Sequence, residues 1–114
     1  MSFLSTLFGS KSEASDKIKV LDKNEYAKAI SGRPVQLVDV RTANEYHGGH
    51  IKNAKNIDFF NPTKFKQAFE ALDKTKPVYI YCRSGARSQK AARKLVDMGF
   101  EQIFDLRGGY ARWS

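Results

Sequence analysis

Short apolar runs alternate with helix-periodic segments along the chain from residue 18 onward. This alternation is typical of a parallel β-sheet flanked by helices, because consecutive parallel strands need a crossover between them. We therefore expect a single α/β domain with a parallel sheet covered by helices. The expected strands are Ile18–Val20, Val35–Val40, a brief strand around Asn56 and Ile57, Val78–Tyr81 and Ile103–Leu106.

Helix start signals follow several of these runs. Asp22–Glu25 and Thr42–Glu45 have the spacing of capping boxes, and Asn61 followed by Pro62 predicts an N-cap with proline in the first turn. Two of the expected helices carry apolar positions on one face, namely Phe65, Ala68, Phe69 and Leu72 in the first and Ala91, Ala92, Leu95 and Val96 in the second. The second helix is expected to end at Gly99.

Composition places the chain among ordinary globular domains. It has 114 residues, 41% of them hydrophobic and 28% charged, which is enough for one core without disulfides or metals. The net charge of +8 is spread along the chain between acidic residues rather than concentrated on one element. We therefore expect no nucleic-acid partner, and expect the excess charge to attract small anions or acidic partner proteins.

The first 17 residues differ from the rest. They contain an apolar patch, Phe3–Phe8, with no basic residue before it, followed by a segment rich in serine. The patch is too short for a membrane span or an export signal. We expect residues 1–17 to form a flexible leader and residues 18–114 to form the domain, although a short helix that touches a membrane surface or a partner is an alternative.

Cys82 is the only cysteine, so no internal disulfide can form and a reducing cytoplasm is the expected location. It follows the apolar run Val78–Tyr81 and begins the loop sequence Cys82–Ser88. At the turn from a strand to a helix, unpaired backbone N–H groups attract negative charge. Arg83 and Arg87 add two cations, so the pattern predicts an ionised thiol in an anion-binding loop.

A lone free cysteine is more often an inert core residue than a nucleophile. The polar residues around Cys82 favour the functional interpretation here, because they would make a poor core. The loop residues expected to bind substrate are Arg83, Ser84, Gly85, Ala86, Arg87 and Ser88. In open parallel sheets ligands bind beyond the carboxyl ends of the strands, so Cys82 and the segment Asp39–Arg41 should lie at the same edge.

Three separated segments resemble the rhodanese family. They are Asp39–Ile57, with the pattern Asp-Val-Arg, Glu-Tyr, Gly-His-Ile and Ala-x-Asn-Ile; the loop Cys82–Ser88; and the closing motif Leu106–Trp113. The resemblance covers about residues 18 to 114. It implies a sulfurtransferase domain with a five-stranded parallel sheet flanked by helices on both faces.

The resemblance also implies a reaction. Cys82 would take sulfane sulfur from a small anionic donor such as thiosulfate, hold it as a persulfide, and pass it to cyanide or to the thiol of a small molecule or protein. No cofactor is implied. Loop N–H groups would hold the anionic charge, with Arg87 just before the helix as the clamp and Arg83 at the entrance.

The remaining candidates are interpreted as structural. Asp39 and Arg41 are expected to form an ion pair that supports the site rather than to act on substrate. His47 and His50 are separated by two glycines and lack a third ligand, so we expect no metal site and a structural hydrogen bond for His50.

Two other functions stay open on the sequence. A cysteine phosphatase of related fold would carry arginine six positions after the cysteine, where this chain has Ser88. A sulfur carrier or interaction module would need the same fold and, if loaded with sulfur, the same cysteine. Thiosulfate turnover, aryl phosphate hydrolysis and sulfur uptake from a protein donor distinguish the three. The sequence gives neither the physiological donor and acceptor nor the oligomeric state.

Overall fold

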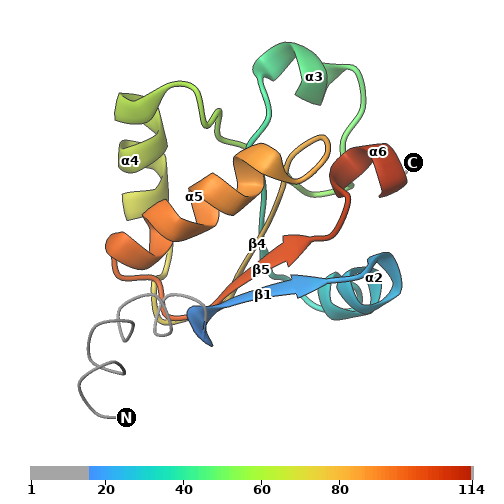
Figure 1. Cartoon of the computed structure of the whole chain (residues 1–114), viewed down its shortest axis with the longest axis horizontal. Helices are drawn as coiled ribbons and strands as arrows, with labels where there is room; N and C mark the ends of the chain where they lie inside the picture. The colour runs from blue at the N-terminus through green and yellow to red at the C-terminus, as the bar shows by residue number, and fades with distance from the viewer. Residues whose placement is uncertain (1–15, 114) are drawn as a thin grey trace, which may run out of the picture.

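The computed structural model describes residues 16–113, which form a five-stranded, wholly parallel sheet in the order β1-β5-β4-β2-β3 (Figure 1). The strands are β1 (Ile18–Leu21), β2 (Gln36–Asp39), β3 (Lys55–Asn56), β4 (Val78–Tyr81) and β5 (Ile103–Leu106). The predicted sheet is thereby confirmed, with ends that differ from the expected ones by a residue or two. Of the expected leader, residues 1–15 lie outside the described residues.

Five helices connect and follow the strands: α2 (Lys23–Ile30), α3 (Ala43–His47), α4 (Pro62–Glu70), α5 (Ala86–Asp97) and α6 (Gly109–Trp113). Both predicted capping boxes are present, at Asp22 and Thr42, and Asn61 caps α4 ahead of Pro62. One boundary was wrong. Arg87 lies inside the first turn of α5 rather than before the helix, because Gly85 supplies the backbone turn that starts it.

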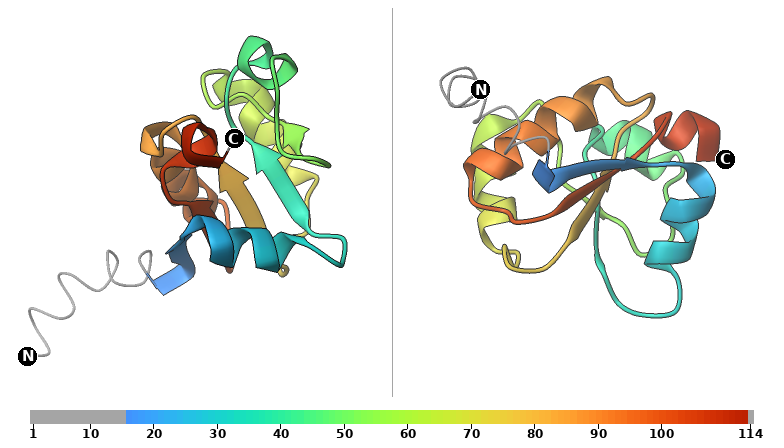
Figure 2. Two further views of the ribbon diagram at one scale, coloured as in Figure 1. Left: turned by 90° about the vertical axis from the view of Figure 1, so that its right-hand side faces the viewer. Right: turned by 60° about the horizontal axis from the view of Figure 1, so that its bottom comes forward.

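Helices cover both faces of the sheet (Figure 2). The α4 and α5 face buries aromatic and aliphatic side chains such as Phe65, Phe69 and Leu95 against Val38 and Ile80. On the opposite face, residues of α2 and α6 pack on alternate strand positions of β4 and β5, including Tyr79, Tyr81 and Leu106. The strands are parallel, so their carboxyl ends meet at one edge. No helix within residues 16–113 is long and apolar enough to cross a bilayer.

Candidate active site

Cys82 lies directly after β4, whose four residues are all buried. It is 1% exposed and belongs to the buried cluster that α4 and α5 cover. The Gly85 backbone N–H donates to Sγ over 3.0 Å, and the thiol lies 3.4 Å from the Ser88 hydroxyl oxygen. The thiol is therefore more enclosed than a reactive group at an open sheet edge is expected to be.

The loop turns at Gly85, which has φ +114° and stands at the N-cap of α5 without a side-chain cap. Glycine adopts this conformation readily, whereas a side chain rarely does. The turn aims the Gly85 N–H at the sulfur and leaves the first N–H groups of α5 without intrahelical acceptors. Ser88 donates its own hydroxyl proton to the Gly85 carbonyl oxygen, 3.2 Å away. The chain thus wraps around one sulfur atom.

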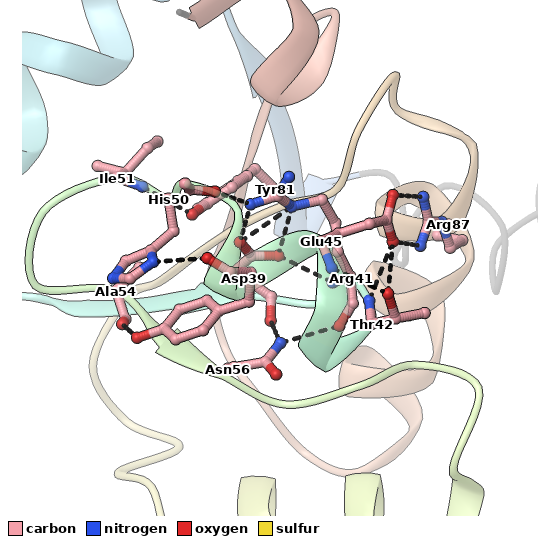
Figure 3. A network of polar contacts seen from close by, with 12 residues as sticks. Asp39, Arg41, Thr42, Glu45, His50, Ile51, Ala54, Asn56, Tyr81 and Arg87 are labelled. Carbon is pink, nitrogen blue, oxygen red and sulfur yellow. Dashed lines mark hydrogen bonds and ion pairs between the residues drawn. The ribbon is translucent and has the colours of Figure 1, made fainter.

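The two arginines of the loop are placed differently. Arg83 and Ser84 are exposed at the outside of the loop. Arg87 makes a bidentate ion pair with Glu45 of α3, with N–O distances of 2.7 and 2.9 Å (Figure 3). Its guanidinium also lies 5.4 Å from the ring centre of Phe60, an exposed aromatic residue. The Arg87 guanidinium is therefore held by a carboxylate of the segment Asp39–Ile57.

This ion pair stabilises the ionised form of Glu45. Hydrogen bonds from Arg87 and Thr42 outweigh the effect of burial and lower the pKa of Glu45 to about 2. The pKa of the Arg87 guanidinium is raised by the same partner. Glu45 and Arg87 thus stay ionised, and bridge α3 to α5 over the Cys82 loop.

The bridge predicts a defined acid sensitivity. The folded pKa of Glu45 lies below its ordinary value of 4.5, so its stabilising effect is present above pH 4.5 and is lost as the pH falls toward 2. Glu45→Gln is expected to lower the free energy of unfolding by about 1 kcal/mol at pH 6, after allowance for solvent screening. The free energies of unfolding of the wild type and Glu45→Gln, measured by denaturant titration, should become equal near pH 2. A difference that does not change with pH would contradict this assignment.

Asp39 and Arg41 form the expected ion pair, fully buried at the end of β2 with a shortest N–O distance of 2.6 Å. Arg41 also donates from Nη2 to the Gly49 carbonyl over 2.7 Å. Its guanidinium lies 4.4 Å from the ring centre of Tyr110. The segment after β2 lies at the same edge as Cys82, since the Val40 N–H donates to the Tyr81 carbonyl. The pair joins the segment after β2 to Gly49 and to Tyr110. Among the described residues it makes no hydrogen bond to the Cys82 sulfur.

The closing motif is bound to the backbone of the cysteine loop. The Tyr110 N–H donates to the Cys82 carbonyl over 2.8 Å, and the Ala111 N–H donates to the Arg83 carbonyl over 2.9 Å. Gly109 approaches so closely that a Cβ atom there would lie 2.4 Å from the Arg83 carbonyl oxygen. Arg41 of the segment Asp39–Ile57 therefore packs against the closing motif, and the closing motif is hydrogen-bonded to the loop Cys82–Ser88.

Both histidines pack locally against Tyr46 rather than against the Cys82 loop. His50 makes the expected hydrogen bond, from Nδ1 to the Tyr46 carbonyl at 2.8 Å, and stacks on the Tyr46 ring. His47 packs edge-on against the same ring. Within residues 16–113, no three His, Cys, Asp or Glu side chains form a cluster that could hold a metal ion.

Sequence reasoning missed two acidic residues beside the loop. Glu45 was interpreted only as a helix cap, and its pairing with Arg87 spans 42 positions, so no local pattern could reveal it. Asp105 is buried in β5, in register with Ile80 of β4. Its signal was a carboxylate inside the otherwise apolar run Ile103–Leu106, which sequence reasoning did not weigh.

Fold and loop together define a class: an open parallel α/β domain whose single cysteine follows the central strand β4 and accepts a hydrogen bond from a backbone N–H of the loop. The rhodanese-like domain model matches residues 22–114. The chain belongs to the rhodanese-like domain family.

Individual relatives agree with this assignment. The chain is 38% identical over 97 residues to the uncharacterized protein YqhL of Bacillus subtilis, covering 85% of this chain and 73% of that protein. It is 34% identical over 96 residues to the thiosulfate sulfurtransferase GlpE of Coxiella burnetii, covering 84% and 87% of the two chains. The crystal structure of a rhodanese-like domain protein from Staphylococcus aureus superposes with a TM-score of 0.73 at 32% identity, covering 84% of this chain and 91% of that one. The similarity to GlpE supports an enzyme of the sulfurtransferase type.

Proposed function

We propose that the protein transfers sulfane sulfur from a small anionic donor such as thiosulfate to cyanide or to a thiol, through a persulfide on Cys82. The observation that carries the proposal is the burial of the Cys82 sulfur at the uncapped start of α5, where the Gly85 N–H donates to it. Such donors stabilise an anion on sulfur as oxyanion-hole donors stabilise an anion on oxygen. Thiosulfate sulfurtransferases among the relatives support the same donor.

The reaction would proceed in two displacements. The Cys82 thiolate attacks the outer sulfur of thiosulfate, the S–S bond of the donor breaks, and sulfite leaves with the electron pair. A persulfide with its charge on the terminal sulfur remains in the loop. An acceptor nucleophile then attacks that terminal sulfur, and the bond to Sγ breaks with return of the electron pair to Cys82. The only cysteine of the chain has no internal resolving partner, so the acceptor must come from outside.

The remaining loop residues have supporting roles in this proposal. Arg83 and Ser84, exposed beside the entrance, and Ala86 at the start of α5 contribute charge and N–H groups to donor binding. Arg87 attracts the anionic donor in competition with Glu45. The buried pair Asp39 and Arg41 holds the surrounding loops in place.

Two substitutions test the role of Arg87. Arg87→Ala is expected to raise the KM for thiosulfate about tenfold, because one charge-assisted contact to the donor is lost. Glu45→Gln is the matched variant, which frees Arg87 and should lower KM or leave it unchanged. Steady-state kinetics of sulfite release measures both. An unchanged KM in Arg87→Ala would remove Arg87 from the donor site.

A phosphatase is the less favoured function. The position that a phosphatase loop gives to arginine is occupied by Ser88, whose hydroxyl donates to the Gly85 carbonyl oxygen and accepts from the cysteine thiol. Arg87 is bound to Glu45. Neither side chain is free to clamp the equatorial oxygens of a phosphoryl group. Hydrolysis of an aryl phosphate that depends on Cys82 would reverse this ranking.

A sulfur carrier remains the nearest alternative. The same enclosed sulfur would store a persulfide delivered by another protein. A carrier should turn over thiosulfate poorly but accept sulfur from a desulfurase, whereas the proposed enzyme should be loaded by thiosulfate alone.

A further inference from the structure

A hollow lies on the face of the sheet opposite the Cys82 sulfur. Its walls are the end of α2, the connection from α2 to β2, the segment before β3, and α6. Its volume is about 830 Å³, within the range of sites that hold small organic molecules. Cys82 belongs to the core cluster under α4 and α5, whereas Leu37 and Ile51 of the hollow belong to the cluster on the other face. None of the described residues that line the hollow comes from the loop Cys82–Ser88.

The inner wall of this hollow is apolar. Leu37 and Ile51 are buried in it. Ile30, Val35 and Trp113 are half-buried beside them and pack against the same core cluster. Apolar surface that faces water gives a favourable free energy when a ligand covers it. The wall therefore favours a ligand with a hydrocarbon part.

The rim of the hollow is positively charged. Arg33, after α2, and Lys52, before β3, are exposed at this rim. The described residues that line the hollow include no Asp or Glu, and the ion pairs formed within residues 16–113 use neither of the two cations. Arg33 also lines a neighbouring hollow with Asp73, whose carboxylate accepts hydrogen bonds from Thr75. Two cations without an acidic partner beside an apolar wall favour a ligand with an anionic end.

We propose that this hollow binds a small amphipathic carboxylate, with its hydrocarbon part on the apolar wall and its carboxylate at Arg33 and Lys52. An inorganic anion would leave the wall in contact with water, and a neutral hydrocarbon would leave the two cations without a partner. The binding is non-covalent and does not depend on the sulfur transfer proposed above. Because the hollow and the Cys82 sulfur lie on opposite faces of the sheet, both can be occupied at once.

Trp113 makes this binding measurable, because it lines the hollow and is the only tryptophan of the chain. The probe is octanoate, titrated into the full chain while the tryptophan emission is recorded. We expect a saturable change in emission. Butyrate should bind at least about tenfold more weakly, because four methylene groups are lost. The neutral analogue 1-octanol keeps the chain length and should also bind about tenfold more weakly, because it lacks the charge. Equal affinities for octanoate and 1-octanol would overturn the proposal.

Substitutions at the rim test where the carboxylate binds. Arg33→Gln and Lys52→Gln should each weaken octanoate binding about fivefold and leave the binding of 1-octanol unchanged. Lys66→Gln is the matched control, since it removes an exposed cation from α4 on the other face of the sheet. This control should bind octanoate as the wild type does. All three positions are exposed, so the variants are expected to fold. Wild-type octanoate affinity in both rim variants would contradict the assignment.

Amide chemical shifts locate the ligand independently of the tryptophan signal. Octanoate should shift the ¹H–¹⁵N resonances of Gly32, Ile51 and Lys52, which line the hollow, and leave that of Gly85 unchanged. Shifts confined to the loop Cys82–Ser88, or no shifts at millimolar octanoate, would refute the proposal. Neither measurement uses a sulfur donor. A protein that binds octanoate in the hollow but takes up no sulfur would therefore refute the proposed function and leave this inference intact.

Discussion

Cys82→Ser is expected to lower thiosulfate:cyanide sulfur transfer by at least about 10³-fold, since a serine hydroxyl neither forms a persulfide nor ionises near neutral pH. The measurement is the rate of thiocyanate formation with purified protein. The effect should fall on the chemical step, because the loop N–H groups that bind the donor remain. Retained turnover in the serine variant would show that the enclosed sulfur is not the nucleophile.

The control for this variant is its fold. Serine is close to cysteine in size, and the Gly85 N–H and Ser88 hydroxyl that surround Sγ can also bond to a hydroxyl oxygen. We therefore expect the free energy of unfolding to change by no more than about 1–2 kcal/mol. Thermal unfolding followed by circular dichroism checks it, so that lost activity is assigned to chemistry rather than to unfolding.

Gly109→Ala is expected to destabilise the domain by about 3 kcal/mol or more and to remove activity with it. The residue has φ +64°, and an added Cβ would meet backbone atoms of Arg83 and Cys82 at 2.4 to 2.6 Å. Neither strand β4 nor the loop after it can move without breaking the hydrogen bonds that Tyr110 and Ala111 make there. The cost of the strained backbone conformation and the cost of the overlap with fixed backbone atoms therefore both lower the stability of the variant. Denaturant unfolding and sulfur transfer should both report the loss.

Gly108→Ala is the matched control, one residue earlier. Its φ of +76° imposes similar backbone strain, but the nearest atom to an added Cβ is Cγ of Arg112, at the base of a flexible, exposed side chain. The expected cost is about 1 kcal/mol. Equal effects at the two positions would mean that contact between the closing motif and the cysteine loop is not what positions the loop.

Much of the fold was predictable because its determinants are local. The capping boxes at Asp22 and Thr42 depend on side chains three positions apart, and Val78–Tyr81 is buried on both faces because it is central in the sheet. The parallel sheet followed from the alternation of strands and helices. The strand order depends on which strand each connection places next to which other strand. The periodicity of one sequence does not contain that information.

The site was predictable only in part, because some of its contacts are local in sequence and others are not. The position of Cys82 at the carboxyl end of a strand, the turn at Gly85 and the Asp39–Arg41 pair arise within a few residues of each other. The Glu45–Arg87 bridge joins elements that are distant in sequence, so Arg87 was expected to be free. The burial of Asp105 depends on the packing of helices on β5, which no motif encodes.

The persulfide is the central claim, and the intact mass of the protein after treatment with thiosulfate tests it most directly. We expect the wild-type protein to gain the mass of one sulfur atom, to lose it on addition of a reducing thiol or cyanide, and Cys82→Ser to gain nothing. An unchanged wild-type mass, or a gain that persists in the serine variant, would contradict sulfur transfer through Cys82.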